Sequence, residues 1–192
     1  MRILLLALLA LAVAPTVSAQ PGAAYYGVAL GTFDYQEEDG VGGELFSDSV
    51  SSYRLMVGYQ FMEHLTVEGG YGKTGTIRDS ALLTIPGPGG GTFPLNFSAE
   101  FSILTIRLLG VLPFDNGISL LGGLGYADMK QDVDFTFAGA PSSGEATGNE
   151  PTLYVGAQYD WDRVAVRLGY EKYDFGSEVA VEETSLTVFY KL

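Results

Sequence analysis

The stretch that decides the fold spans residues 153–171 and reads LYVGAQYDWDRVAVRLGYE, two alternating runs around a short acidic turn. Because successive side chains of a β-strand point to opposite faces, this alternation predicts an antiparallel hairpin. One face of the hairpin is apolar or aromatic and comprises Leu153, Val155, Ala157, Tyr159, Val164, Val166, Leu168 and Tyr170. The opposite face combines small residues with a few polar ones and comprises Tyr154, Gly156, Gln158, Arg167, Gly169 and Glu171.

The composition of this second face separates two kinds of all-β fold. In a water-soluble sandwich, the face opposite the apolar one would be rich in Lys, Glu and Thr. Glycines with isolated charges instead suit the narrow interior of a closed barrel whose apolar face contacts lipid. The hairpin therefore favours a transmembrane barrel over a soluble sandwich.

The N-terminus has the three parts of a secretory signal peptide. Arg2 supplies a positive charge, residues 3–14 are apolar, and residues 17–19 (VSA) precede Gln20. The alternative, a membrane-anchor helix, needs about 20 apolar residues, and Pro15 interrupts this run. We expect cleavage after Ala19, which gives a signal peptide of residues 1–19 and an outer-membrane barrel of residues 20–192.

Charge and cysteine content exclude several kinds of partner and site. The formal net charge is −13, and loss of Arg2 with the signal peptide leaves nine Lys and Arg against 23 Asp and Glu, or −14. An acid excess of this size argues against nucleic acid as a partner. The absence of cysteine excludes disulfides, thiolate metal sites and a lipid-modified N-terminal cysteine.

Alternation recurs along the mature chain and predicts eight strands, at residues 25–33, 53–61, 65–72, 101–112, 118–129, 153–159, 164–171 and 185–192. Residues 133–137 are a candidate extension of the fifth. Short turns follow the second, fourth and sixth strands, and long polar loops span residues 34–49, 73–98, 130–150 and 174–183. Alternating long and short connections are typical of outer-membrane barrels. We predict an all-β fold, an eight-stranded antiparallel up-and-down transmembrane β-barrel with its long loops outside the cell.

Tyrosines on the outward face lie mostly near strand ends, where a barrel meets the two surfaces of the membrane. They are Tyr26, Tyr53, Tyr59, Tyr71, Tyr126, Tyr159, Tyr170 and Tyr190. We expect them to form the aromatic girdles that such barrels place at both interfaces.

Four segments carry a resemblance to a known family: residues 25–31 (YYGVALG), 68–72 (EGGYG), 122–126 (GGLGY) and 166–170 (VRLGY). In order and spacing they resemble the small eight-stranded outer-membrane barrels, the family of the OmpA-type transmembrane domain and OmpX-like proteins. The likeness covers all eight strands and no loop. Members usually end on an aromatic residue, whereas this chain ends on Leu192 after Tyr190.

The resemblance implies a place and a set of partners. The place is the bacterial outer membrane of a Gram-negative cell envelope, reached by export through the periplasm. The implied partners are outer-membrane lipid and lipopolysaccharide, together with the outer-membrane assembly machinery, and the implied state is a monomer.

Five charged residues fall on the inward face of the predicted strands: Arg54, Glu68, Arg107, Arg167 and Glu171. Glu68, Arg107 and Arg167 have similar predicted depths, and the other two lie closer to the outer rim. Unpaired charges in a narrow lumen are costly, so we expect an ion-paired network in which Glu68 pairs with Arg107 or Arg167. Such a network is either a structural plug or a gate. The interior of an eight-stranded barrel is barely wide enough for its side chains, which favours the plug.

Catalysis, cofactor binding and metal binding find little support. The one histidine, His64, falls in a short turn with no serine and acid arranged as a triad, so we expect neither an enzyme nor a cofactor. Glu37, Glu38 and Asp39 offer carboxylates to a divalent cation, but their spacing matches no calcium loop and favours a solvated acidic loop. Residues 86–91 (PGPGGG) lack the Gly-Lys-Ser/Thr of a phosphate loop.

Two functions of different classes fit these predictions. The first is a structural or surface-interaction barrel whose lumen is plugged by ion-paired side chains. The second is a narrow porin-like channel for small solutes. Both require the same strands, so the contents of the lumen distinguish them.

Overall fold

A computed structural model of the chain describes residues 22–38, 44–84, 91–114, 116–137, 139–174 and 179–192. The predicted signal peptide with its cleavage site, Asp39, and most of the glycine-rich stretch at 86–91 lie outside the described residues. The same holds for the side chains of Glu37 and Glu38, which belong to a strand.

The described chain is built from antiparallel β-strands. They are β1 (Ala23–Glu38), β2 (Glu44–Met62), β3 (Leu65–Thr74), β4 (Ile77–Thr84), β5 (Thr92–Pro113), β6 (Ile118–Phe137), β7 (Ala140–Trp161), β8 (Val164–Asp174) and β9 (Val179–Lys191). Among the described residues, no helix has the length and apolar composition needed to cross a membrane.

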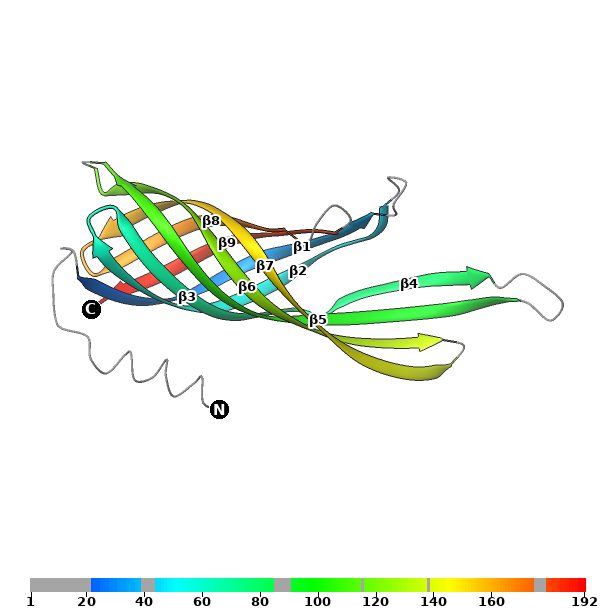
Figure 1. Cartoon of the computed structure of the whole chain (residues 1–192). Coiled ribbons are helices and arrows are strands. Elements are labelled where there is room, and N and C mark those ends of the chain that lie inside the picture. The colour runs from blue at the N-terminus through cyan, green and yellow to red at the C-terminus, as the bar shows by residue number, and fades with distance from the viewer. Residues whose placement is uncertain (1–21, 39–43, 85–90, 115, 138, 175–178) are drawn as a thin grey trace.

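The strands form a closed ring, which Figure 1 shows as a barrel seen from the side. Neighbours in the sheet follow chain order, β9 pairs with β1, and β3 closes the ring by pairing with β5. β3 and β4 share one position in the ring, because β3 pairs with the part of β5 at 102–110 and β4 with the part at 92–99. The ring therefore has eight positions, and the predicted fold class is confirmed.

The tilt of the strands follows from their register. The directly paired residues around the ring, starting at Ala24 of β1, are Tyr59, Val67, Leu108, Leu124, Leu153, Lys172, Glu182 and, back on β1, Asp34. The offset between positions 24 and 34 is a shear of ten residues. With strands about 4.8 Å apart and a rise of about 3.3 Å per residue, this shear tilts eight strands by about 40°, within the usual range for closed barrels.

Exposure confirms the predicted inward and outward faces in the half of the barrel that carries the short turns. Outward side chains such as Leu124 and Leu168 are 69% and 58% exposed, whereas inward Tyr154 and Thr105 are buried. The outward aliphatic and aromatic side chains of this turn-side half form a continuous surface, here called the apolar belt. Seven of the eight predicted girdle tyrosines are exposed in it, and Tyr170 is partly exposed.

In the far half of the barrel the pattern is reversed. Its interior is filled by an apolar cluster, here called the far cluster, of Phe33, Ile77, Ala99, Phe101, Ile103, Ala127, Met129, Tyr173 and Val181. Its outward positions are polar: Asp128, Asp132 and Asp134 alternate on β6 with inward Ala127, Met129 and Val133. This half therefore has the pattern of a water-soluble barrel, with a dry core and a solvated surface.

The predicted loop boundaries were wrong for all four long loops. Residues 34–38 and 44–49 belong to the β1–β2 hairpin, 77–84 and 92–98 to the β4–β5 hairpin, most of 130–150 to β6 and β7, and 179–183 to β9. The predicted extension of the fifth strand through 133–137 is confirmed, since β6 ends at Phe137. The prediction recognised strands by apolar residues on the outward face, and in the far half that face is polar.

Gly123 of β6 gives a direct test of how closely the inward face packs. A Cβ at Gly123 would lie 2.1 Å from the Leu108 carbonyl oxygen, whereas at the outward-facing Gly122 the nearest atom is the Tyr154 carbonyl oxygen at 3.9 Å. We expect Gly123→Ala to lower the free energy of unfolding by about 1–3 kcal/mol and Gly122→Ala to change it by less than about 0.5 kcal/mol. Urea unfolding in lipid vesicles measures both, and equal losses would contradict the assigned faces of β6.

Candidate functional site

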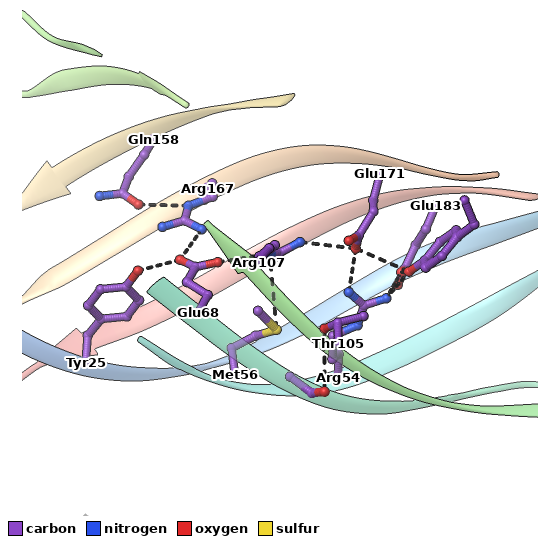
Figure 2. A network of polar contacts seen from close by, with 12 residues as sticks. Tyr25, Arg54, Met56, Glu68, Thr105, Arg107, Gln158, Arg167, Glu171 and Glu183 are labelled. Atoms are coloured by element: carbon purple, nitrogen blue, oxygen red, sulfur yellow. Dashed lines mark hydrogen bonds and ion pairs between the residues drawn. The ribbon is translucent and has the colours of Figure 1, made fainter. Parts of the chain in front are cut away.

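The five charged residues expected in the lumen lie there together. Arg54 projects from β2, Glu68 from β3, Arg107 from β5, and Arg167 and Glu171 from β8, and none is more than 5% exposed. Alternation places each of them on the inward face, and Figure 2 shows them joined in one set of polar contacts, here called the lumen network. This network is the candidate functional site.

Glu68 is the turn-side centre of the lumen network. Its Oε2 accepts a hydrogen bond from Arg107 Nε at 3.0 Å, and its Oε1 accepts one from Arg167 Nη1 at 2.6 Å. The Tyr25 hydroxyl also donates to Oε1, and Arg167 Nε donates to Gln158 Oε1 at 2.9 Å. Glu68 thus holds both arginines that the sequence offered as alternative partners.

Arg107 links the two ends of the network. Besides Glu68, its guanidinium donates from Nη1 to Glu171 Oε2 at 3.1 Å, and it stacks over the Tyr154 ring with 4.1 Å between Cζ and the ring centroid. In Figure 2 Arg107 accordingly lies between Glu68 on one side and Glu171 on the other. Movement of Arg107 would unpair carboxylates on both sides.

Arg54 is the far-side centre of the network, and it has a partner that sequence reasoning missed. Its Nη1 donates to Glu171 Oε2 at 2.6 Å, and its Nη2 donates to Glu183 and to the Tyr173 hydroxyl. Glu183 is buried and also accepts a hydrogen bond from Ser52 Oγ at 2.7 Å. The sequence prediction had assigned Glu183 to the last long loop.

A signal for Glu183 was present in the sequence. The inward residues Ser185, Thr187 and Phe189 of β9 alternate with outward ones. Continuing this alternation by one step toward the N-terminus places Glu183 in the lumen. The charges also indicate it, because three arginines and two glutamates leave one positive charge uncompensated. With Glu183 the lumen network has three arginines and three glutamates and a net charge of zero.

Nearly all buried polar atoms of the described lumen have a partner. Within the described residues, the buried side-chain atoms without a hydrogen bond are Thr152 Oγ1 and Glu171 Oε1. A buried charge is costly unless it is paired and hydrogen-bonded. All six charged side chains are paired and hydrogen-bonded, Glu171 through its Oε2.

The lumen differs above and below the network. On the turn side there is a cavity of about 280 Å³ whose lining includes Thr66, Ser119 and Gln158, and which ends at Arg167 and Phe189. On the other side the far cluster begins at Tyr173, whose hydroxyl donates to Glu183 Oε2 at 2.9 Å. Along the barrel axis the order is a cavity with a mixed polar and apolar lining, an ion-paired layer and an apolar layer.

The described residues bring no catalytic or metal-binding group together around His64. Its side chain is 60% exposed, and its imidazole lies 4.0 Å from the Glu63 carboxylate. Among the described residues, no three His, Asp or Glu side chains are placed to hold a metal ion.

Comparison with known proteins identifies the fold and the family. In the solved structures, the chain is similar to Ail, the attachment invasion locus protein of Yersinia pestis, at 17% identity and a TM-score of 0.56, covering 88% of this chain and 99% of Ail. Neisserial surface protein A gives 17% identity, a TM-score of 0.53 and the same coverages. OprG of Pseudomonas aeruginosa gives 13% identity and a TM-score of 0.50, with 90% of this chain and 98% of OprG covered. At these identities the likeness shows the fold alone.

No sequence among the curated proteins matches this chain. A family model described as outer membrane protein beta-barrel domain, however, matches residues 3–191. The match spans nearly the whole chain, so this protein belongs to the outer-membrane β-barrel family, whose members lie in the bacterial outer membrane.

Proposed function

We propose that this protein is a structural barrel of a Gram-negative outer membrane that is closed to solutes and presents a folded β-sheet surface outside the cell. It reaches the membrane by export through the periplasm, loses residues 1–19, and is inserted as a monomer by the outer-membrane assembly machinery. It performs no catalysis. The far half of the barrel stands outside, beside lipopolysaccharide, and the short turns face the periplasm.

The observation that supports a closed lumen is that two successive layers of side chains fill it. The six-charge network spans the interior of the turn-side half, and the far cluster fills the interior beyond it. An ion entering from the periplasmic cavity meets the Arg167–Glu68 pair first and must then pass the apolar packing around Phe33 and Phe101. Two seals of different chemistry support a plug rather than a gate.

The surface-interaction part of the proposal rests on a sheet that projects beyond the other strands. β4 and the far parts of β5, β6 and β7 form it, with Arg78, Ser98, Asp134 and Ser143 directly paired in a row across the four strands. Figure 1 shows these strands extending past β1, β2, β8 and β9. The projecting sheet offers a rigid surface for a partner.

The two faces of the projecting sheet differ in chemistry. Its outward face is polar, with a depression of about 430 Å³ lined by residues that include Arg78, Asn96 and Asp134. Its inward face carries Phe97, Val133 and Phe135, and Phe135 remains 39% exposed. Exposed apolar area beside polar groups is typical of interaction surfaces.

Electrical recording in planar bilayers tests the closed lumen. We expect the wild-type barrel to give no conductance steps under conditions where a general porin, inserted in parallel, gives them. Arg107→Ser should also remain silent, because the far cluster still seals the interior. Insertion is verified separately by protection of the turn-side half from added protease.

The channel alternative makes the opposite prediction for the same experiment. Reproducible steps from the wild-type barrel, with an amplitude that changes in Arg107→Ser, would show that solutes pass through the lumen network. That result would replace the plug by a narrow porin-like channel.

A further inference from the structure

The cavity on the turn side of the lumen network, here called the turn-side cup, opens toward the short turns. Its volume is about 280 Å³, and each of the eight ring positions contributes at least one lining residue. At about 30 Å³ per molecule it has room for roughly nine waters, and it lies just below the range of about 300–1,000 Å³ that is usual for drug-sized ligands. The turn-side cup therefore suits one small ligand, which the proposed orientation would supply from the periplasm.

Two buried residues in the turn-side cup carry hydroxyl groups without a partner in the described protein. Thr66 on β3 and Ser119 on β6 are 3% and 5% exposed, and neither hydroxyl hydrogen-bonds to another described residue. Both residues line the cavity, whereas Thr152 Oγ1 is fully enclosed. Because a buried hydroxyl without a hydrogen bond costs free energy, these two groups favour a ligand that can bond to them.

Polar residues line two separate walls of the turn-side cup. Thr66 is directly paired with Gln60 of β2 on one wall, and Ser119 is directly paired with Gln158 of β7 on the other. The two walls are separated by β5 on one side and by β8, β9 and β1 on the other. Gln60 Nε2 donates to the Glu63 carbonyl oxygen at 2.9 Å, and Gln60 Oε1 accepts no hydrogen bond from a described residue. Hydroxyls both donate and accept, so each wall can bond to a ligand that does the same.

Apolar side chains line the turn-side cup between these two walls. Val111 lies on β5 on one side, and Ala165 and Phe189 lie on β8 and β9 on the other. A flat ring with hydroxyl groups around its edge and C–H groups on its two faces matches this arrangement. Its edge would bond to the polar walls, and its faces would contact the apolar ones.

The charges that line the turn-side cup are already paired inside it. Arg167 Nη1 donates to Glu68 Oε1 at 2.6 Å, and Lys191 Nζ lies 2.6 Å from Asp160 Oδ1. Among the described lining residues the remaining charge is Glu63, whose side chain is 76% exposed at the rim. A charged ligand would lose its hydration and find no free counter-charge in the cup, which favours a neutral one.

We propose that the turn-side cup binds a neutral monosaccharide or a ring polyol of similar size. Hydroxyl groups of the ligand bond to Thr66, Ser119 and Gln60, and its ring lies between Val111 and Phe189. Arg167 belongs both to the lumen network and to the lining of the cup. A conducting lumen would carry the same cup at its mouth, so the site does not depend on whether the barrel is closed.

Saturation-transfer NMR of the full barrel, in micelles of a detergent without a sugar headgroup, tests the site. The probes are glucose, galactose, mannose and inositol, with glucosamine and glucuronate as charged counterparts. We expect saturable binding of at least one neutral probe, and binding of both charged probes that is weaker by about tenfold or more. Thr66→Val and Ser119→Ala should each weaken binding of the neutral probe about fivefold, the effect of losing one hydrogen bond.

Thr105→Val is the matched control, because Thr105 is also buried in the lumen but does not line the turn-side cup. It should bind the neutral probe as the wild type does, and urea midpoints establish that all variants fold. Absence of saturable binding by every neutral probe would overturn the proposal, since water alone would then fill the cup. Equally tight binding of a charged probe, or unchanged binding in both Thr66→Val and Ser119→Ala, would overturn it as well.

Discussion

Replacement of Glu68 by Gln is expected to lower the free energy of unfolding by about 3–5 kcal/mol, the cost of removing one partner from a buried ion pair. Glu68 is buried and accepts hydrogen bonds from Arg107, Arg167 and Tyr25. Without its charge, Arg167 loses its only carboxylate partner among the described residues, and Arg107 keeps Glu171 alone. Urea unfolding in lipid vesicles, followed by the fluorescence of the single tryptophan, Trp161, measures the loss.

A double-mutant cycle separates this pairing from general damage. Arg107→Met combined with Glu68→Gln should cost less than the sum of the two single changes by more than about 0.5 kcal/mol, because the second change removes one of the unpaired charges. Glu63→Gln is the control, since this carboxylate is exposed in a short turn. The substitution should change the free energy of unfolding by less than about 0.5 kcal/mol. Additive effects with Arg107 and with Arg167 would mean that water, not arginine, solvates Glu68.

Replacement of Leu168 by Arg is expected to lower the free energy of unfolding by about 2–4 kcal/mol, the penalty for a cation on the lipid face near the middle of the membrane. Leu168 is the third of five outward positions between Val164, at the short turn, and Lys172, at the far rim of the belt. Its direct neighbours Ala157 and Leu186 are also outward and apolar, so no acid compensates the new charge.

The control for depth is Thr184→Arg on the adjacent strand β9. Thr184 also faces outward, but it lies at the rim of the belt, beside Thr32 and Tyr170. The same substitution there should cost only about 0–1 kcal/mol. If both variants unfolded at the same urea concentration, the apolar belt would not be the lipid-facing surface.

The turn-side half could be predicted from sequence almost completely. In residues 153–171 the alternation separates lipid-facing from lumen-facing side chains, because one face is uniformly apolar or aromatic and the other combines small residues with polar ones. Inward charges are rare enough in such strands that each one stands out. The three arginines of the lumen network, Glu68 and Glu171 were therefore found from their inward positions in the strand alternation alone.

The far half could not be predicted in the same way, because the two faces exchange their character along a single strand. On β6, Leu124 faces outward and is apolar, while four residues later Asp128 faces outward and is acidic. Periodicity alone cannot distinguish such a polar outward face from a polar loop, particularly where glycine, serine and proline are frequent, as at 140–151. Glu183 was missed for the same reason, since it lies where β9 leaves the apolar belt.

The central claim is that one barrel continues past the membrane as a folded extension with its own apolar core. Hydrogen–deuterium exchange of the wild-type protein in lipid nanodiscs tests it most directly, because a far half that projects from the membrane into water has only its strand pairing to protect its amides. The paired segments 95–103 of β5 and 129–137 of β6 decide the question. We expect both to exchange as slowly as residues 118–126, which lie in the apolar belt. Exchange of 95–103 and 129–137 at the rate of unstructured peptide would contradict the claim and leave a short barrel with long loops.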